Sequence, residues 1–229
     1  LEEFPHPILV VDVAHGDAKY ALDYAETLVG MGPLVVSGNI VTSDAAQRYW
    51  DIGVRWFRLG LGSGSVCSTR TIAGVGIPNF TAVWSIREAF PDAVILLDGG
   101  MKNSGGIVKS LAAGADAVIL GRLLAGAKEA PGKRKRKWGL FGPQLKSFRG
   151  MASSSALLEA DKELNVEGVE TFIPIEGSLE QIVDKLCRGI RAGLAYCGAR
   201  TIKELQEKAQ FVRITEHGAR EGFRSTTPD

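Results

Sequence analysis

The sequence predicts an α/β fold with a parallel sheet, and three observations favour it. Short runs rich in apolar and β-branched residues alternate with segments of helical spacing over the first 130 residues. The runs are nearly continuous in apolar residues, which is typical of parallel strands covered on both faces. Glycines follow these runs directly, at the strand ends where α/β sheets and barrels carry their active sites.

The expected elements follow one another in strand–helix order. The apolar runs predict strands at 8–13, 34–36, 56–61, 93–97 and 117–120. Apolar residues at helical spacing predict helices at 18–29, 43–52, 83–89 and 105–113. This repetition produces βαβ units, in which each helix returns the chain to the start of the next parallel strand.

The character of the chain changes at Pro131, so we divide it into the parts 1–130, 131–178 and 179–229. The middle part opens with the basic run 133–137, which predicts a solvated hairpin or loop. A polyanion-binding patch is the alternative interpretation of that run. The polar, serine-rich residues 150–168 predict a mobile flap.

The last part, 179–229, predicts helices at 179–197 and 202–209, since apolar residues recur there at helical spacing. A short strand is expected at 211–214, and a loose tail from residue 218 onward.

Composition and charge exclude several classes of protein. Lys and Arg total 27 against 26 for Asp and Glu, so the net charge of +1 gives no electrostatic case for a nucleic-acid partner. No apolar run reaches the roughly 18 residues that a membrane span needs, and the first residues lack the regions of a signal peptide. Three cysteines, an odd number, argue against a secreted disulfide framework. We therefore expect a cytoplasmic protein.

Cys67 is the candidate nucleophile. It lies in a loop rich in Gly and Ser, residues 60–78, that follows an expected strand. Successive backbone amides in such a loop suit an anion, and with Arg70 nearby they would favour the thiolate over the thiol. An inert buried thiol is the alternative, and it is the interpretation that we assign to Cys187 and Cys197.

Polar residues at other strand ends complete the candidate site. Asp98 could hydrogen-bond a ribose diol, as carboxylates do in nucleotide sites, or it could cap a turn. Asp12 and Asn39 end the first and second expected strands in the same way.

Taken together, these segments resemble the IMP dehydrogenase/GMP reductase family, from about residue 7 to residue 215. The resemblance rests on motifs that occur in the family's order: Val11-Asp12-Val13, Ser37-Gly38-Asn39, Gly64-Ser65-Val66-Cys67-Ser68-Thr69-Arg70, Ala73-Gly74-Val75-Gly76, Asp98-Gly99-Gly100, Leu123-Leu124-Ala125-Gly126, Arg149-Gly150-Met151 and Tyr196-Cys197-Gly198.

The resemblance implies a (β/α)8 TIM barrel of which this chain holds about five strands, the fourth to eighth of the family. We expect the other three strands to come from another polypeptide or from an upstream segment. Family members are usually tetramers, so a homo-oligomer is expected. The implied ligands are a purine nucleoside monophosphate (GMP or IMP), NADP or NAD, and K⁺.

The resemblance also implies a role for each candidate residue, with Cys67 bonding covalently to purine C2. The catalytic residues are Cys67, Thr69 and Glu167. The substrate-binding residues are Ser65, Asp98, Gly99, Gly100, Gly121, Arg122, Gly150 and Met151. The cofactor-binding residues are Asp12, Asn39, Gly60 and Gly62, and the backbone carbonyls of Gly62, Gly64 and Cys67 would hold the monovalent cation.

The two branches of the family differ in the flap. A dehydrogenase hydrolyses its intermediate with an Arg–Tyr pair there, and neither residue type occurs between Met151 and Glu167. We therefore favour a reductase, which converts GMP to IMP and ammonia with NADPH. The segments 73–76, 129–132 and 209–215 look more like bacterial IMP dehydrogenase, which oxidises IMP to XMP with NAD, so that activity stays open. An inactive family-related subunit is a third interpretation.

Two positions depart from the family pattern near the expected phosphate. Arg122 stands where dehydrogenases usually have a serine, and it could either bind phosphate bidentately or point outward. Phe148 replaces a tyrosine, so one hydroxyl contact is lost.

Overall fold

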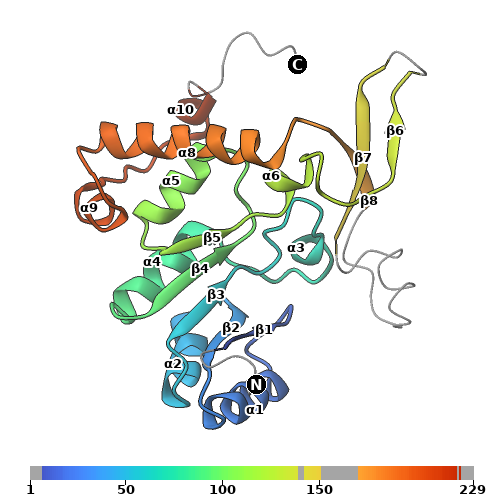
Figure 1. The fold of residues 1–229 in the computed structure, drawn as a ribbon. Coiled ribbons are helices and arrows are strands. Elements are labelled where there is room, and N and C mark those ends of the chain that lie inside the picture. Colours follow the sequence, from blue (N-terminus) through green and yellow to red (C-terminus); the bar gives the residue numbers. More distant parts are fainter. Residues whose placement is uncertain (1–6, 139–141, 151–169, 221, 223–229) are drawn as a thin grey trace.

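The computed structural model describes residues 7–138, 142–150, 170–220 and 222 of the 229-residue chain. A five-stranded parallel sheet forms its centre, in the order β1-β2-β3-β4-β5 (Figure 1). The strands are β1 (Ile8–Asp12), β2 (Leu34–Ile40), β3 (Trp56–Leu59), β4 (Val94–Asp98) and β5 (Ala117–Ile119). The predicted α/β class and the parallel sheet are confirmed.

Four helices connect the strands: α1 (Lys19–Gly30), α2 (Ser43–Asp51), α4 (Asn79–Ala89) and α5 (Ser104–Ala112). Because each strand lies beside its predecessor and parallel crossovers are right-handed, these helices must return on one side of the sheet. Contacts between α1 and α2, α2 and α4, and α4 and α5 show the single layer that results. Consecutive strands with helices on one side are the arrangement of a barrel segment rather than of a doubly wound sheet.

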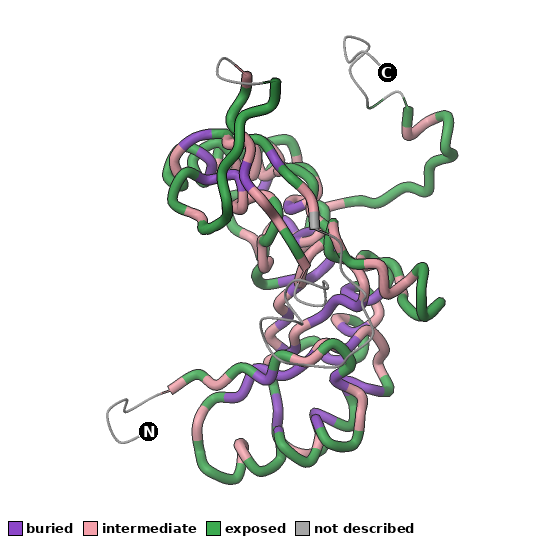
Figure 2. The backbone as a smooth tube through the Cα atoms, turned by 90° about the vertical axis from the view of Figure 1, so that its right-hand side faces the viewer, coloured by how far each residue is buried: buried purple, intermediate pink, exposed green. Residues whose placement is uncertain are grey.

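The helix-covered face of the sheet holds the main core. Phe57 and Leu59 of β3 are fully buried, and so is Ile95 of β4. Figure 2 shows the buried positions gathered along these strands. Phe57 packs with Trp50 and Phe90 at centroid distances of 6.3 and 5.9 Å, which fixes α2 and the turn after α4 on the sheet.

The opposite face of the sheet is open, as the expected absence of three barrel strands implies, although the apolar runs by themselves are typical of strands covered on both faces. Ile8 and Val10 of β1 are 57% and 56% exposed, and Trp56 of β3 is only partly buried. The local pattern of apolar residues is the same whether the second layer belongs to this chain or to another, so only the count of strands against the family barrel indicated the open face.

Side-chain caps set where several helices begin. Thr42 accepts from the Ala45 amide at the start of α2, and Asn103 accepts from the Gly106 amide at the start of α5. A capping box of Ser178 and Gln181 starts α8 (Leu179–Tyr196). Polar residues at these positions satisfy amides that the first helical turn leaves unpaired.

The sequence predicts a hairpin or a loop for the basic run, and the run forms a hairpin: its residues make a strand of a second, antiparallel sheet. Its order is β6 (Arg134–Arg136), β7 (Gln144–Arg149) and β8 (Glu170–Pro174). Figure 1 shows the β6–β7 hairpin projecting from the rest of the chain. The expected flap at 150–168 lies outside the described residues, apart from Gly150.

The remaining helices are α3 (Thr69–Ile72), α6 (Arg122–Ala125), α9 (Ile202–Lys208) and α10 (Glu216–Arg220). The predicted strand at 211–214 is wrong, because this segment runs along α4 as coil. Phe211 packs there on Phe80 and Trp84, with centroid distances of 4.7 and 5.9 Å. The tail expected from 218 is helical as far as Arg220 in α10.

Lys146 of β7 is a fully buried cation that ties the second sheet to the turn after α6. Its ammonium donates to the carbonyl oxygens of Ala127 and Ala130, the latter at 2.5 Å. We expect Lys146→Met to lower the free energy of unfolding by about 2–4 kcal/mol, since both carbonyls would lose a charged donor. Urea denaturation measures this loss, with exposed Lys133→Met as the control. A loss below about 0.5 kcal/mol, the usual range for surface changes, would contradict the assignment.

Candidate functional site

The carboxyl ends of the parallel strands meet at one edge of the sheet, and the turns that follow them line two adjoining cavities. The larger cavity has a volume of about 650 Å³ and the smaller one about 390 Å³. Both are lined by Asp98, the last residue of β4, and by Gly99, which follows it. The two cavities therefore form one continuous site.

The described candidate residues line the two cavities largely by their expected roles, although Gly64, Asp98, Gly99 and Gly150 line both. Those expected to bind substrate line the larger cavity: Ser65, Asp98, Gly99, Gly100, Gly121, Arg122 and Gly150. Those expected to bind cofactor or cation, or to act as catalysts, line the smaller cavity: Asp12, Asn39, Gly60, Gly62, Gly64, Cys67 and Thr69. Met151 and Glu167 lie outside the described residues.

The loop after β3 takes its shape from Arg70. The guanidinium donates from Nε to the Leu61 carbonyl at 2.8 Å and from Nη2 to the Ile77 carbonyl at 2.7 Å. Gly62 has a φ of +64°, and a Cβ there would lie 2.7 Å from Arg70 Cγ, so glycine is required. Through these two hydrogen bonds Arg70 joins the start and the end of the loop and stabilises its conformation.

Cys67 is exposed at the edge of the smaller cavity, which rules out the interpretation as an inert buried thiol. Its Sγ lies 3.0 Å from Thr69 Oγ1, within hydrogen-bonding distance. The Cys67 amide donates to the Gly64 carbonyl at 3.0 Å, which closes a turn of the loop at this residue. Cys187 and Cys197 are partly buried in and just after α8. A thiol placed in this way can reach a ligand, and the neighbouring hydroxyl can exchange a proton with it.

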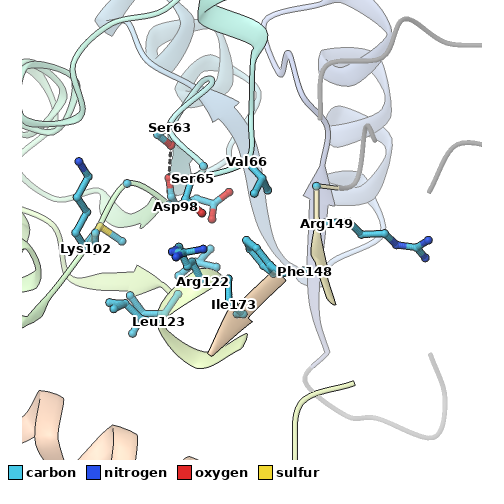
Figure 3. A pocket seen from close by; sticks show the side chains of 18 of the residues that line it. Ser63, Ser65, Val66, Asp98, Lys102, Arg122, Leu123, Phe148, Arg149 and Ile173 are labelled. Carbon is cyan, nitrogen blue, oxygen red and sulfur yellow. Dashed lines mark hydrogen bonds between the residues drawn. The ribbon is translucent and has the colours of Figure 1, made fainter. Parts of the chain in front are cut away.

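Asp98 is held from three sides. Its main-chain oxygen accepts from Ser63 Oγ at 2.7 Å, a bond drawn in Figure 3. Its Oδ2 accepts from Arg58 Nη2 at 2.8 Å and from Asn39 Nδ2 at 3.3 Å. Among the described residues, Arg58 and Asn39 are the partners of the Asp98 carboxylate. The carboxylate therefore does not cap a turn.

Gly60 brings the loop after β3 close to the end of β4, and Gly100 follows the end of β4. Gly60 has a φ of +134°, and a Cβ there would lie 2.4 Å from the Asp98 carbonyl oxygen. Gly100 has a φ of +83°, and a Cβ there would lie 2.7 Å from Asn79 Nδ2. A side chain at Gly60 would force the loop after β3 away from the end of β4, whereas at Gly100 the positive φ and the Asn79 side chain favour glycine.

Arg122 lines the larger cavity at the end where the phosphate is expected. Figure 3 shows its side chain between Asp98 and Ile173, whereas Arg149 points away from the other labelled side chains. Phe148 lines the same cavity and brings no hydroxyl group. The guanidinium of Arg122 therefore lines the same cavity as Phe148, which stands where the family pattern has a tyrosine.

Arg58 is a residue of the site that our sequence reasoning missed. It lies in β3, lines both cavities, and pairs with Asp12 as well as Asp98. The available signal was an arginine inside the apolar run Trp56–Leu59, a position where a charge is rarely placed without a partner.

The chain matches known proteins along nearly its whole length. The family model described as IMP dehydrogenase / GMP reductase domain matches residues 2–224. An inosine-5′-monophosphate dehydrogenase of Halalkalibacterium halodurans is 42% identical over 228 residues, which cover 93% of this chain and 46% of that protein. A GMP reductase of Leishmania donovani is 40% identical over 232 residues, with the same two shares.

Solved structures give the same result. A crystal structure of a GMP reductase variant from Trypanosoma brucei, in complex with guanosine 5′-monophosphate, superposes with a TM-score of 0.89 at 35% identity. The superposition covers 96% of this chain and 48% of that one. The chain thus spans about half the length of the relatives that it matches.

Proposed function

The chain belongs to the IMP dehydrogenase/GMP reductase family, and on that premise we propose that it is a purine nucleotide oxidoreductase acting through a covalent bond between Cys67 and purine C2. The larger cavity takes the nucleoside monophosphate and the smaller cavity takes the nicotinamide. The observation that carries this proposal is the Cys67 thiol, 3.0 Å from the Thr69 hydroxyl, on a cavity that shares Asp98 and Gly99 with its neighbour.

The residues of the chain divide the work between binding and bond making. The amides of Ser65, Gly99, Gly100 and Gly121, with Arg122, hold the 5′-phosphate, and Asp98 holds the ribose. In the reductase direction the Cys67 thiolate bonds to C2 of GMP, and the C2–amino bond breaks. The amino group takes up a proton and leaves as ammonia. A nicotinamide, when bound, would supply the hydride that C2 needs, and Cys67 would then leave as the thiolate as the C–S bond breaks, giving IMP.

A nicotinamide cofactor fits the smaller cavity. Asn39 Oδ1 is buried and has no hydrogen-bond partner among the described residues, and Asn39 lines this cavity. An unpaired buried acceptor costs free energy that an incoming amide donor would recover. Asp12, Asn39, Gly60 and Gly62 would hold the nicotinamide, which supplies or accepts the hydride when bound. Binding of K⁺ by the carbonyls of Gly62, Gly64 and Cys67 stays a prediction.

Reductase and dehydrogenase activities remain the two candidates, and we favour the reductase because the flap lacks both Arg and Tyr. The dehydrogenase is the second candidate, since dehydrogenases stand beside reductases among relatives of about 40% identity. Absorbance of the nicotinamide separates them: GMP-dependent loss of NADPH supports the reductase. IMP-dependent formation of NADH would instead support the dehydrogenase. If neither reaction occurs, the chain is an inactive subunit.

We also propose that the five parallel strands are the fourth to eighth strands of a (β/α)8 barrel. The consecutive strand order and the open apolar face of the sheet support this arrangement. Three further strands, from an upstream segment or a second polypeptide, would cover that face. A homotetramer of such barrels in the cytoplasm is the assembly that the family resemblance implies.

Arg122 gives a direct test of the phosphate end of the site. We expect Arg122→Met to weaken GMP binding by about 10- to 30-fold, since a charged donor to the phosphate is lost. Guanosine, which has no phosphate, should bind to both proteins within about twofold. Calorimetry measures the four affinities, with exposed Arg188→Met as the control. Equal losses for GMP and guanosine would contradict a phosphate contact.

A further inference from the structure

We propose that Arg58 is a positioning residue that holds the carboxylates of Asp12 and Asp98 and so joins the nicotinamide and ribose ends of the site. The inference rests on the proposed function and names a residue outside the motifs that identify the family. Arg58 does not need to touch the reacting atoms for this role, because it acts through the two carboxylates that line the cavities.

Arg58 lies in β3, where its charged side chain is largely removed from water and needs negatively charged partners. Its neighbours Phe57 and Leu59 are fully buried on the helix-covered face, so Arg58 points to the open face. The side chain is nevertheless only 12% exposed. A guanidinium removed from water to this extent needs paired negative charge, and here two carboxylates supply it.

The guanidinium connects strands that do not touch each other. Nη1 forms an ion pair, but no hydrogen bond among the described residues, with the carboxylate of Asp12 at the end of β1, and Nη2 donates to Asp98 Oδ2 at the end of β4 at 2.8 Å. In the sheet, β2 and β3 lie between those two strands. The planar fork of arginine can serve two acceptors in fixed directions, which a point charge does less well.

The neighbouring strand makes room for this arrangement. Arg58 pairs with Gly38 of β2, and a Cβ at Gly38 would lie 2.1 Å from the Arg58 carbonyl oxygen and 2.9 Å from its Cβ. The next residue, Asn39, adds a second donor to Asp98 Oδ2 at 3.3 Å. With Oδ2 engaged in this way, Oδ1 of Asp98 is the oxygen left to accept from ribose hydroxyls.

Loss of the Arg58 charge should therefore lower the affinity that the ribose hydroxyls contribute. Without it, two carboxylates of like charge would face one cavity, and Asp98 would lose the shorter and charged one of the two hydrogen bonds that orient it. A general structural defect would weaken all ligands alike, whereas a positioning defect removes the discrimination between ligands with and without ribose hydroxyls.

The test compares the affinities for GMP and for 2′,3′-dideoxy-GMP by calorimetry. We expect the wild-type protein to prefer GMP by about 10- to 100-fold, as for hydrogen bonds to a charged group. In Arg58→Met and Arg58→Gln this preference should fall below about threefold, and Arg58→Lys, which keeps the charge, should restore at least half of it. Arg87→Met is the matched control, since Arg87 is also partly buried and paired with Asp116, away from the cavities.

The outcomes separate this inference from the function on which it rests. A folded Arg58→Met or Arg58→Gln protein that keeps the wild-type preference would overturn the role of Arg58, and so would an Arg58→Lys protein that loses it. If the neutral variants do not fold, the lysine variant decides. A wild-type protein that binds GMP and its dideoxy analogue equally would instead count against the proposed ribose site at Asp98.

Discussion

Cys67→Ser is expected to lose nicotinamide turnover by about 10³-fold or more while its affinity for GMP or IMP changes by less than threefold. A serine hydroxyl is almost wholly protonated at neutral pH and is a far weaker nucleophile than a cysteine thiolate. The substitution is nearly isosteric, and the residue is exposed, so neither the loop nor the cavity should change. Steady-state nicotinamide absorbance and nucleotide calorimetry give the two readouts.

Cys187→Ser is the control for that experiment. Cys187 lies in α8 and lines neither cavity, so its loss should leave both turnover and affinity as they are. Turnover by Cys67→Ser within tenfold of the wild-type value would show that the reaction does not pass through a covalent bond to this sulfur. Loss of nucleotide affinity in parallel with turnover would point to a structural role for the thiol.

The second large effect concerns the open face of the sheet. Studied by itself, the 229-residue chain exposes the apolar side chains of Ile8 and Val10 on β1, the edge strand of the described sheet, which pairs only with β2 there. We expect it to self-associate and to bind a hydrophobic dye, since exposed apolar faces and unpaired edges favour both. Addition of the first three strands and helices of a family barrel should abolish dye binding and give one cooperative melting transition.

Sedimentation, dye fluorescence and calorimetric melting follow this change. A peptide of the same length from the last strands of a family barrel serves as the control, because it would duplicate strands that are already present. A chain that is monomeric by itself, excludes the dye and melts in one transition would refute the barrel proposal.

The sequence was sufficient to predict the parallel sheet and the position of most of the site. Apolar runs and the glycines behind them predict where strands end, and parallel strands bring those ends to one edge. That is why Asp12, Asn39 and Asp98, far apart in the chain, could be expected to line one site.

What the sequence could not predict depends on partners far away in the chain. In the sequence, Arg58 is a charged residue within an apolar strand, and only the structure shows its partners Asp12 and Asp98. Lys146 looks like a surface lysine until its two carbonyl partners are known. The segment 211–214 has the composition of a strand, but Phe211 is held by aromatic packing on α4. The open face of the sheet leaves no mark in the local pattern of residues, and only the comparison of five strands with the family's eight indicated it.

Protection of Cys67 from alkylation tests the central claim most directly, because it needs no turnover. The thiol should react with iodoacetamide in the free protein, and saturating GMP or IMP should slow that reaction by about tenfold or more, since a nucleotide over the thiol excludes the reagent. Peptide mass spectrometry assigns the alkylated cysteine, and inorganic phosphate alone should protect far less. Alkylation of Cys67 at the same rate with and without either nucleotide would contradict a purine site at this sulfur.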